Sequence, residues 1–135
     1  MTTTPSAPAT TTAPLRALQV TSALALLVLG WQFVSAGELV ASGLRDGLGG
    51  HATGAVVLHV VSGLAAAAAV WHRLRGGSTA LAALAAGVFL VGFLQAWSGD
   101  HAPLTVHVPL AIITVATAVW LVVASFTTAR RRPVG

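Results

Sequence analysis

The sequence predicts an all-α integral membrane protein, folded as an up-down four-helix bundle with both termini in the cytoplasm. The 135-residue chain is 56% hydrophobic and contains only seven Lys or Arg and three Asp or Glu residues. These charges leave four long uncharged intervals, of 21, 26, 24 and 29 residues. A helix that crosses a bilayer needs about 20 mostly apolar residues, so each interval is long enough for one span. The sequence lacks the period-2 alternation that a β-barrel requires. A backbone in lipid must satisfy its own hydrogen bonds, so the spans are predicted to be helices.

We expect the spans at residues 15–36, 52–72, 79–97 and 104–127, within one transmembrane domain over residues 15–128. Short connections make consecutive helices antiparallel neighbours. The second and fourth helices then lie diagonally opposite, and both face the bundle axis. Alanines crowd the second helix from Ala65 to Ala69, and the third carries Ala83 and Gly87 four residues apart. Small residues at such positions allow close helix approach.

The two tails differ in composition. Residues 1–14 are Thr, Pro and Ala without a large apolar side chain after Met1, which predicts a disordered cytoplasmic tail. Residues 129–135 form a short basic tail. The first span has a competing interpretation as a signal peptide, because Val34-Ser35-Ala36 resembles a small-residue cleavage site. Its apolar stretch exceeds the usual ~7–15 residues of a signal core, which favours a retained helix.

The charges fix an expected orientation. With four spans, one side carries six arginines and the other carries one arginine with three carboxylates: Arg16, Arg73, Arg75, Arg130, Arg131 and Arg132 against Arg45, Glu38, Asp46 and Asp100. Positively charged residues stay cytoplasmic, so we expect a multi-pass protein of the cell membrane with both termini inside. The basic balance then serves topology and contact with the anionic bilayer surface, and it requires no nucleic-acid partner.

The most informative residues are two histidines within predicted spans. His59 lies about seven residues into the second helix, roughly 10 Å deep, and His107 lies roughly 5–6 Å into the fourth. An ionisable side chain at membrane depth is a functional-site hypothesis by default. At similar depth on facing helices, the two imidazoles can ligate one haem iron. A pair of interhelical hydrogen bonds, or another metal, proton or quinone role, are the alternatives.

Neighbouring residues agree with a haem. Gly63 and Ala111 each follow a histidine by four residues and share its helix face, so they are predicted to leave room for a porphyrin. Gln32 and Gln95 lie near the outer ends of the first and third helices, where they can contact haem propionates or quinone carbonyls. Composition alone also explains the small residues, and an interfacial position also explains the glutamines.

His51 and His101 lie at the outer boundary, where they form a candidate second site for a metal, a quinone or a substrate. Exposed loop histidines are the plainer interpretation. No catalytic residue is identified, since no predicted span contains a carboxylate and no HExxH, phosphate loop or nucleophile elbow occurs. The absence of cysteine excludes disulfides, iron–sulfur clusters and thioether haem attachment within this chain.

The segment Val106-His107-Val108-Pro109-Leu110-Ala111, with His59 two helices earlier, resembles one four-helix half of the haem A synthase family. The layout is also similar to small four-helix b-type cytochromes. The resemblance covers about residues 15–128, and it implies haem b held by histidines on the second and fourth helices. In this chain these are His59 and His107.

The chain departs from that family at several points. Val56 and Val60 stand where the family usually has a glutamate and an arginine, the outer-loop cysteine pair is absent, and the length is half. The resemblance therefore implies haem binding more than oxidation of a haem methyl. A homodimer would restore eight helices.

The expected function is electron transfer or haem handling, because two imidazoles leave six-coordinate iron with no open position. A quinone or a redox protein is the expected partner. Two alternatives remain open: a cofactor-free scaffold subunit of a membrane complex, and an enzyme of the haem A synthase type in which His51 or His101 takes part.

Overall fold

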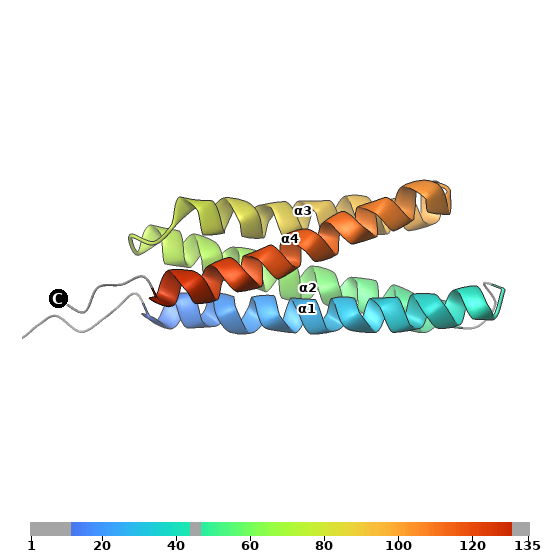
Figure 1. The fold of residues 1–135 in the computed structure, drawn as a ribbon, viewed down its shortest axis with the longest axis horizontal. Helices are drawn as coiled ribbons and strands as arrows, with labels where there is room; N and C mark the ends of the chain where they lie inside the picture. The colour runs from blue at the N-terminus through green and yellow to red at the C-terminus, as the bar shows by residue number, and fades with distance from the viewer. Residues whose placement is uncertain (1–11, 44–46, 131–135) are drawn as a thin grey trace, which may run out of the picture.

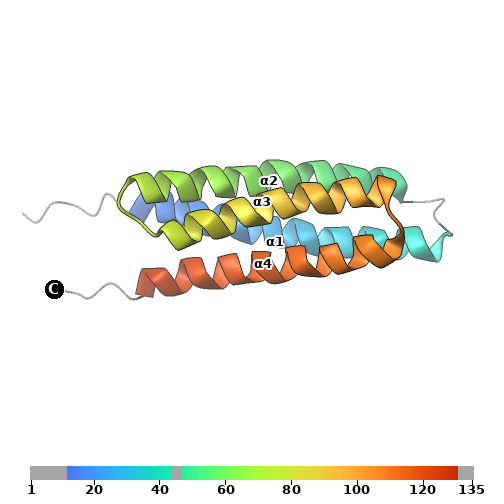
Figure 2. The same ribbon diagram turned by 90° about the horizontal axis from the view of Figure 1, so that it is seen from above.

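The computed structural model describes residues 12–43 and 47–130, which form four long helices: α1 (Thr12–Ala41), α2 (Leu48–Leu74), α3 (Thr79–His101) and α4 (Leu104–Arg130). The helices run alternately up and down in one bundle (Figures 1 and 2). Within the described residues, α1 and α3 each pack against α2 and α4, whereas neither diagonal pair is in contact. The predicted four-helix bundle is confirmed, and so is the diagonal placement of the helices that carry His59 and His107.

The surface of the bundle is apolar around its circumference. Each helix contains a segment long and apolar enough to cross a membrane: Ala13–Ala41, Leu48–Leu74, Thr79–His101 and Leu104–Thr128. Outward side chains such as Leu27, Val56 and Trp120 are about two-thirds exposed. Helices that are hydrophobic all round belong in a membrane or in the core of a larger protein. The chain therefore has the composition and the surface of a multi-pass membrane protein.

The first connection is shorter than predicted, because α1 continues to Ala41 and α2 begins at Leu48. Gly37 does not end α1, since one glycine costs a helix only about 1 kcal/mol. The chain instead turns at Gly43 and Gly47, whose φ angles are 65° and 85°. α1 also begins at Thr12, within the predicted tail. The rest of that tail (residues 1–11), the loop charges at 44–46 and the tail at 131–135 lie outside the described residues.

The third helix also extends past its predicted end. Ser98–His101, predicted as a turn, forms the last turn of α3. The helix stops because Ala102 precedes Pro103 and adopts an extended conformation, with φ −130° and ψ 157°. A residue before proline is pushed out of the helical region. At the other end of α3, the Ser78 side chain caps the helix by accepting from the Leu81 amide at 3.3 Å.

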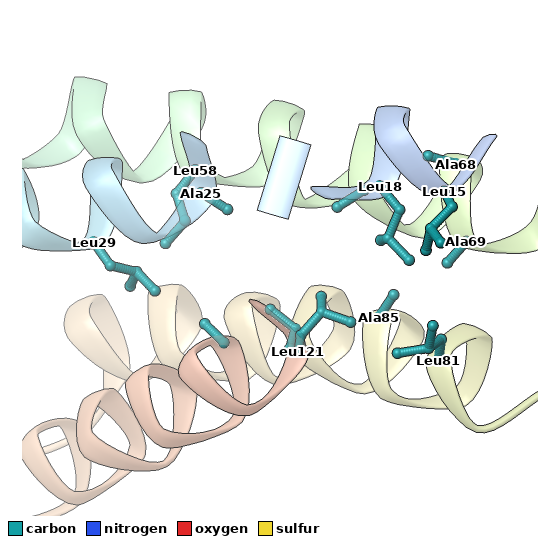
Figure 3. Packing of buried hydrophobic residues seen from close by; sticks show 13 residues of the cluster. Leu15, Leu18, Ala25, Leu29, Leu58, Ala68, Ala69, Leu81, Ala85 and Leu121 are labelled. Atoms are coloured by element: carbon teal, nitrogen blue, oxygen red, sulfur yellow. The ribbon is translucent and has the colours of Figure 1, made fainter. Parts of the chain in front are cut away.

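The two ends of the bundle are packed differently. The terminal end holds the start of α1, the α2–α3 turn and the end of α4, and its core combines aliphatic and small side chains (Figure 3) with the buried polar residues Gln19, His72 and Ser125. There Leu15 and Leu18 of α1 point toward Ala85 and Leu121 of the opposite layer (Figure 3). The opposite end holds the α1–α2 and α3–α4 connections, and it is called the pocket end because the pockets described below lie there. α4 lies beside α1 at the terminal end and runs to the end of α3 at the pocket end (Figure 1).

The α2–α3 turn closes over a buried histidine, and this contact gives a first prediction. His72 is 2% exposed, and a Cβ added at Gly77 would collide with its Nε2, Cδ2 and Cε1 atoms. We expect Gly77→Ala to lower the free energy of unfolding by about 1–3 kcal/mol, as overpacking of a rigid site does. Thermal unfolding in detergent, followed by circular dichroism, measures the change.

Gly87→Ala is the matched control, because nothing lies within 4 Å of a Cβ at this helical position. It should leave stability unchanged or raise it by up to about 1 kcal/mol, the difference in helix propensity between alanine and glycine. Equal melting temperatures for Gly77→Ala and Gly87→Ala would contradict the packing of His72 against the turn.

Candidate functional site

Three imidazoles line one pocket of about 570 Å³ at the pocket end of the bundle. Cavities that hold cofactors and drug-sized ligands are usually ~300–1,000 Å³, mostly apolar, with a few placed polar groups. This lining fits that description. It comprises His51, His59, His107, Gln32, Gln95 and Asp100, with Leu39, Leu48, Ala52, Ala55, Val56, Ala96, Gly99 and Leu104.

His59 is held in one tautomer by its own helix. Its Nδ1 lies 2.7 Å from the carbonyl oxygen of Ala55, one turn earlier. A carbonyl only accepts, so Nδ1 carries the proton and donates it. The lone pair is then on Nε2, which is buried and has no hydrogen-bond partner. A buried acceptor without a hydrogen-bond partner is costly, so Nε2 of His59 is a candidate ligand atom.

The ring of His59 is also fixed from the side. It packs on Phe93 of α3 with ring centroids 4.2 Å apart at an interplanar angle of 58°. Phe93 in turn meets Phe89 edge to face at 5.0 Å. Aromatic contacts of this kind are worth about 0.5–1.5 kcal/mol beyond burial. The imidazole is therefore oriented by both a hydrogen bond and a ring contact.

His107 adopts the same tautomer through a neighbouring helix. The Ser98 hydroxyl donates to the Gln95 carbonyl oxygen at 2.7 Å, so it accepts from Nδ1 of His107 at 3.0 Å. Nε2 of His107 accepts from the Gln95 amide nitrogen at 2.9 Å. Gly99 makes room for this ring, since a Cβ there would lie 3.1 Å from Cε1 of His107. Both histidines thus direct a lone pair from Nε2.

His51 is the third imidazole, and α1 holds it. The Ser35 hydroxyl donates to the Gln32 carbonyl oxygen at 3.1 Å and accepts from Nδ1 of His51 at 3.0 Å. His51 therefore also presents Nε2 as its acceptor. The loop histidine of the sequence prediction belongs to the first turn of α2 and to the same pocket as His59 and His107.

Gln32 braces the turn of α2 that supports His59. In the amide orientation that satisfies both ends, its nitrogen donates to the His51 carbonyl at 3.0 Å and its oxygen accepts from the Ala55 amide at 3.1 Å. Gly54 allows this approach, because a Cβ there would collide with the Gln32 amide. The brace acts on the turn that offers the Ala55 carbonyl to His59.

The other predicted site residues lie elsewhere. His101 does not line the pocket that His51 lines; it is exposed, donates from Nδ1 to the Trp97 carbonyl at 2.9 Å and stacks on the Trp97 ring. Gly63 lies against Phe89, with a Cβ position 3.2 Å from that ring. Ala111 lines a second pocket, of about 500 Å³, between α1 and α4.

The described residues do not include the set of three or more ligating side chains that a metal ion held by protein alone would need. In the regions 12–43 and 47–130, no three His, Cys, Asp or Glu side chains are grouped so as to hold a metal ion. Asp100 lines the pocket but is exposed at the last turn of α3. Two imidazoles suffice as protein ligands when a macrocycle supplies the remaining donors, as in haem proteins with two axial ligands.

Comparisons of the chain with protein-family models, with curated proteins and with solved structures found no match. The geometry of the pocket is therefore the basis on which a function is assigned.

Proposed function

We propose that this chain is a b-type haem protein of the cell membrane, with both termini in the cytoplasm and the pocket end toward the outer face. His59 and His107 are the axial ligands, and the role is electron transfer or haem handling. The observation that carries the proposal is that Nε2 of His59 is a buried acceptor without a hydrogen-bond partner, on a residue that lines the same pocket as His107.

The residues present fit a haem in three respects. Each candidate ligand has its proton held on Nδ1 by a fixed acceptor, the backbone carbonyl of Ala55 or the hydroxyl of Ser98. Metal-bound histidines characteristically have such a partner, which orients the ring and raises its basicity. The pocket is largely apolar, as the porphyrin faces require. Gln95 lines the pocket and can offer its amide to a polar substituent once it releases His107, whereas the Gln32 amide braces α2.

When bound, haem supplies an iron that accepts and returns one electron. The chain's residues hold and orient it. His59 and His107 would both ligate the iron, and a haem with two imidazole ligands would not readily bind oxygen and would favour electron transfer. Gln95 must release Nε2 of His107 for ligation, so its amide is free to donate elsewhere in the pocket. The apolar part of the lining and the hydrogen bonds to the two histidines would then set the reduction potential.

An enzyme of the haem A synthase type is a second candidate, and the position of His51 favours it. His51 lines the same pocket as the two proposed ligands and presents an acceptor nitrogen there. In such an enzyme His51 would act on a haem substituent. Mass spectrometry of haem extracted after aerobic turnover with a reductant distinguishes the two, because only the enzyme returns a chemically altered porphyrin.

Spectroscopic titration tests the proposal directly. Haem added to the purified protein in detergent should bind one to one and give a sharp α-band after dithionite reduction. The double variant His59→Ala/His107→Ala should stay colourless, whereas His101→Ala should match the wild type because His101 lies outside the pocket. A wild-type protein that stays colourless with added haem would leave a cofactor-free scaffold subunit as the function.

Ser98 gives a further prediction, since it holds His107 in the ligating tautomer. Ser98→Ala removes the acceptor of Nδ1, and we expect haem affinity to fall about 10- to 100-fold, the usual cost of losing such a partner. Ser125→Ala is the control, because Ser125 is also fully buried but its hydroxyl bonds only within α4. If haem titrates both variants alike, Ser98 has no part in orienting His107.

A further inference from the structure

The second pocket, of about 500 Å³, lies in the seam between α1 and α4. α4 lies beside α1 at the terminal end, and its start lies at the end of α3 (Figure 1). The pocket is bordered by Phe33, Val40 and Val108, whose side chains are exposed on the apolar outside of the bundle. A pocket with such a border opens sideways, toward lipid, within the predicted span depth.

One wall of this pocket is polar and is shared with the first pocket. Gln32, His51, Gln95 and His107 line both cavities. Among them His51 has its proton fixed on Nδ1 by Ser35, so Nε2 is the acceptor. The shared wall therefore offers a hydrogen-bond acceptor from His51, since the Gln32 and Gln95 amides are engaged with α2 and His107, in an otherwise largely apolar cavity.

We propose that this second pocket binds the ring of a lipid-soluble quinone or quinol, with a ring hydroxyl donating to Nε2 of His51. A lipid acyl chain has no group that uses this polar wall. A water-soluble ligand has no reason to enter from the lipid side. A quinol combines an apolar ring and tail with hydroxyl groups at one end, which matches the cavity's apolar border and polar wall.

The inference deepens the proposed function and rests on it for its biological meaning. Because His107 lines both pockets, a ring in the second pocket lies beside a residue proposed to ligate the haem. The quinone pool is then the class of electron partner that the haem serves. Binding of the ring is a separate property, which can be measured whether or not haem is present.

Photolabelling tests the site. The haem-loaded protein in phosphatidylcholine nanodiscs is illuminated with an azido-ubiquinone, with and without excess decylubiquinone, and labelled peptides are identified by mass spectrometry. We expect label on α1 or α4 at the pocket end that decylubiquinone displaces. His51→Ala should weaken the apparent affinity about tenfold, which corresponds to the loss of one good hydrogen bond.

Two glycines of α1 supply a matched pair of variants. Gly37 lines the second pocket only and Gly30 lines neither, and nothing lies within 4 Å of a Cβ at either position. Gly37→Trp should abolish displaceable labelling and leave the haem spectrum unchanged, whereas Gly30→Trp should retain both. Label that decylubiquinone does not displace, or equal labelling of the two variants, overturns the quinone site.

The absorbance of the same samples separates the two proposals. A wild-type haem spectrum without displaceable label overturns the quinone site alone. Displaceable label on a protein that binds no haem overturns the haem proposal and leaves the quinone pocket standing.

Discussion

His59→Ala is expected to give a folded protein that binds haem more than ~100-fold more weakly than the wild type. The imidazole supplies the buried lone pair of Nε2, and alanine at this position supplies no ligand. Removing the partner that merely orients a metal ligand already costs about 10- to 100-fold, so removing the ligand itself should cost more. Haem titration followed by absorbance measures the affinity.

The same variant should be nearly as stable as the wild type when haem is absent. His59 contributes a ring contact with Phe93, worth about 0.5–1.5 kcal/mol, but it also buries an acceptor without a partner, which costs about 1–3 kcal/mol. These two contributions to the free energy of unfolding oppose each other, so the net change should be small.

Imidazole added to the haem-loaded His59→Ala variant should restore a six-coordinate spectrum, because free imidazole can occupy the space of the deleted side chain. A His59→Ala protein that still binds haem with wild-type affinity would exclude His59 as a ligand.

His107→Ala is expected to lose haem to a similar extent and, unlike His59→Ala, to destabilise the haem-free protein. His107 joins α4 to α3 through hydrogen bonds with Ser98 and Gln95. Its removal leaves both of those side chains without their partner at the pocket end. We expect the free energy of unfolding to fall by about 1–3 kcal/mol, within the range for buried hydrogen bonds in water and in membranes.

Unfolding of the haem-free variants, followed by circular dichroism in detergent, measures this contrast. Ser98→Ala combined with His107→Ala should cost less than the sum of the two single changes, because the variants share one hydrogen bond. Equal stability of haem-free His59→Ala and His107→Ala would show that the Ser98–His107–Gln95 contact does not hold α4 against α3.

The number and order of the helices could be predicted because the charged residues leave only four long uncharged intervals in the sequence. The helix ends could not, because a glycine such as Gly37 is compatible with both a helix and a loop, and the surrounding packing decides. Pro103 does mark an end, since it stops α3 through Ala102, whereas Pro109 lies inside α4 without ending that helix. Of the alanines at 65–69, Ala65, Ala68 and Ala69 are buried in the core and Ala67 is exposed. Ala83 and Gly87 do not pack in the core, because Ala83 is exposed and Gly87 has open space beside it.

The candidate site could be predicted in part, because contacts within one helix follow from sequence spacing whereas contacts between helices do not. The acceptor of His59 is Ala55, four residues earlier on the same helix, and helical spacing makes that neighbour predictable. The partners of His107 come from α3, so they depend on how far α4 is rotated about its axis, which one sequence does not encode visibly. Ser98 was missed for this reason. Ser35 was missed because its contact with His51 depends in the same way on how α1 and α2 are rotated against each other. Gly63 was assigned to a porphyrin, but the structure places it against Phe89.

Electron paramagnetic resonance of the ferric, haem-loaded protein tests the central claim most directly. Two imidazole ligands give low-spin iron, so the wild type should show a low-spin signal. His59→Ala and His107→Ala, loaded with excess haem, should each lose it in favour of high-spin iron or free haem, and His101→Ala should keep it. A high-spin wild type, or a low-spin signal that survives in either ligand variant, would contradict axial ligation by His59 and His107.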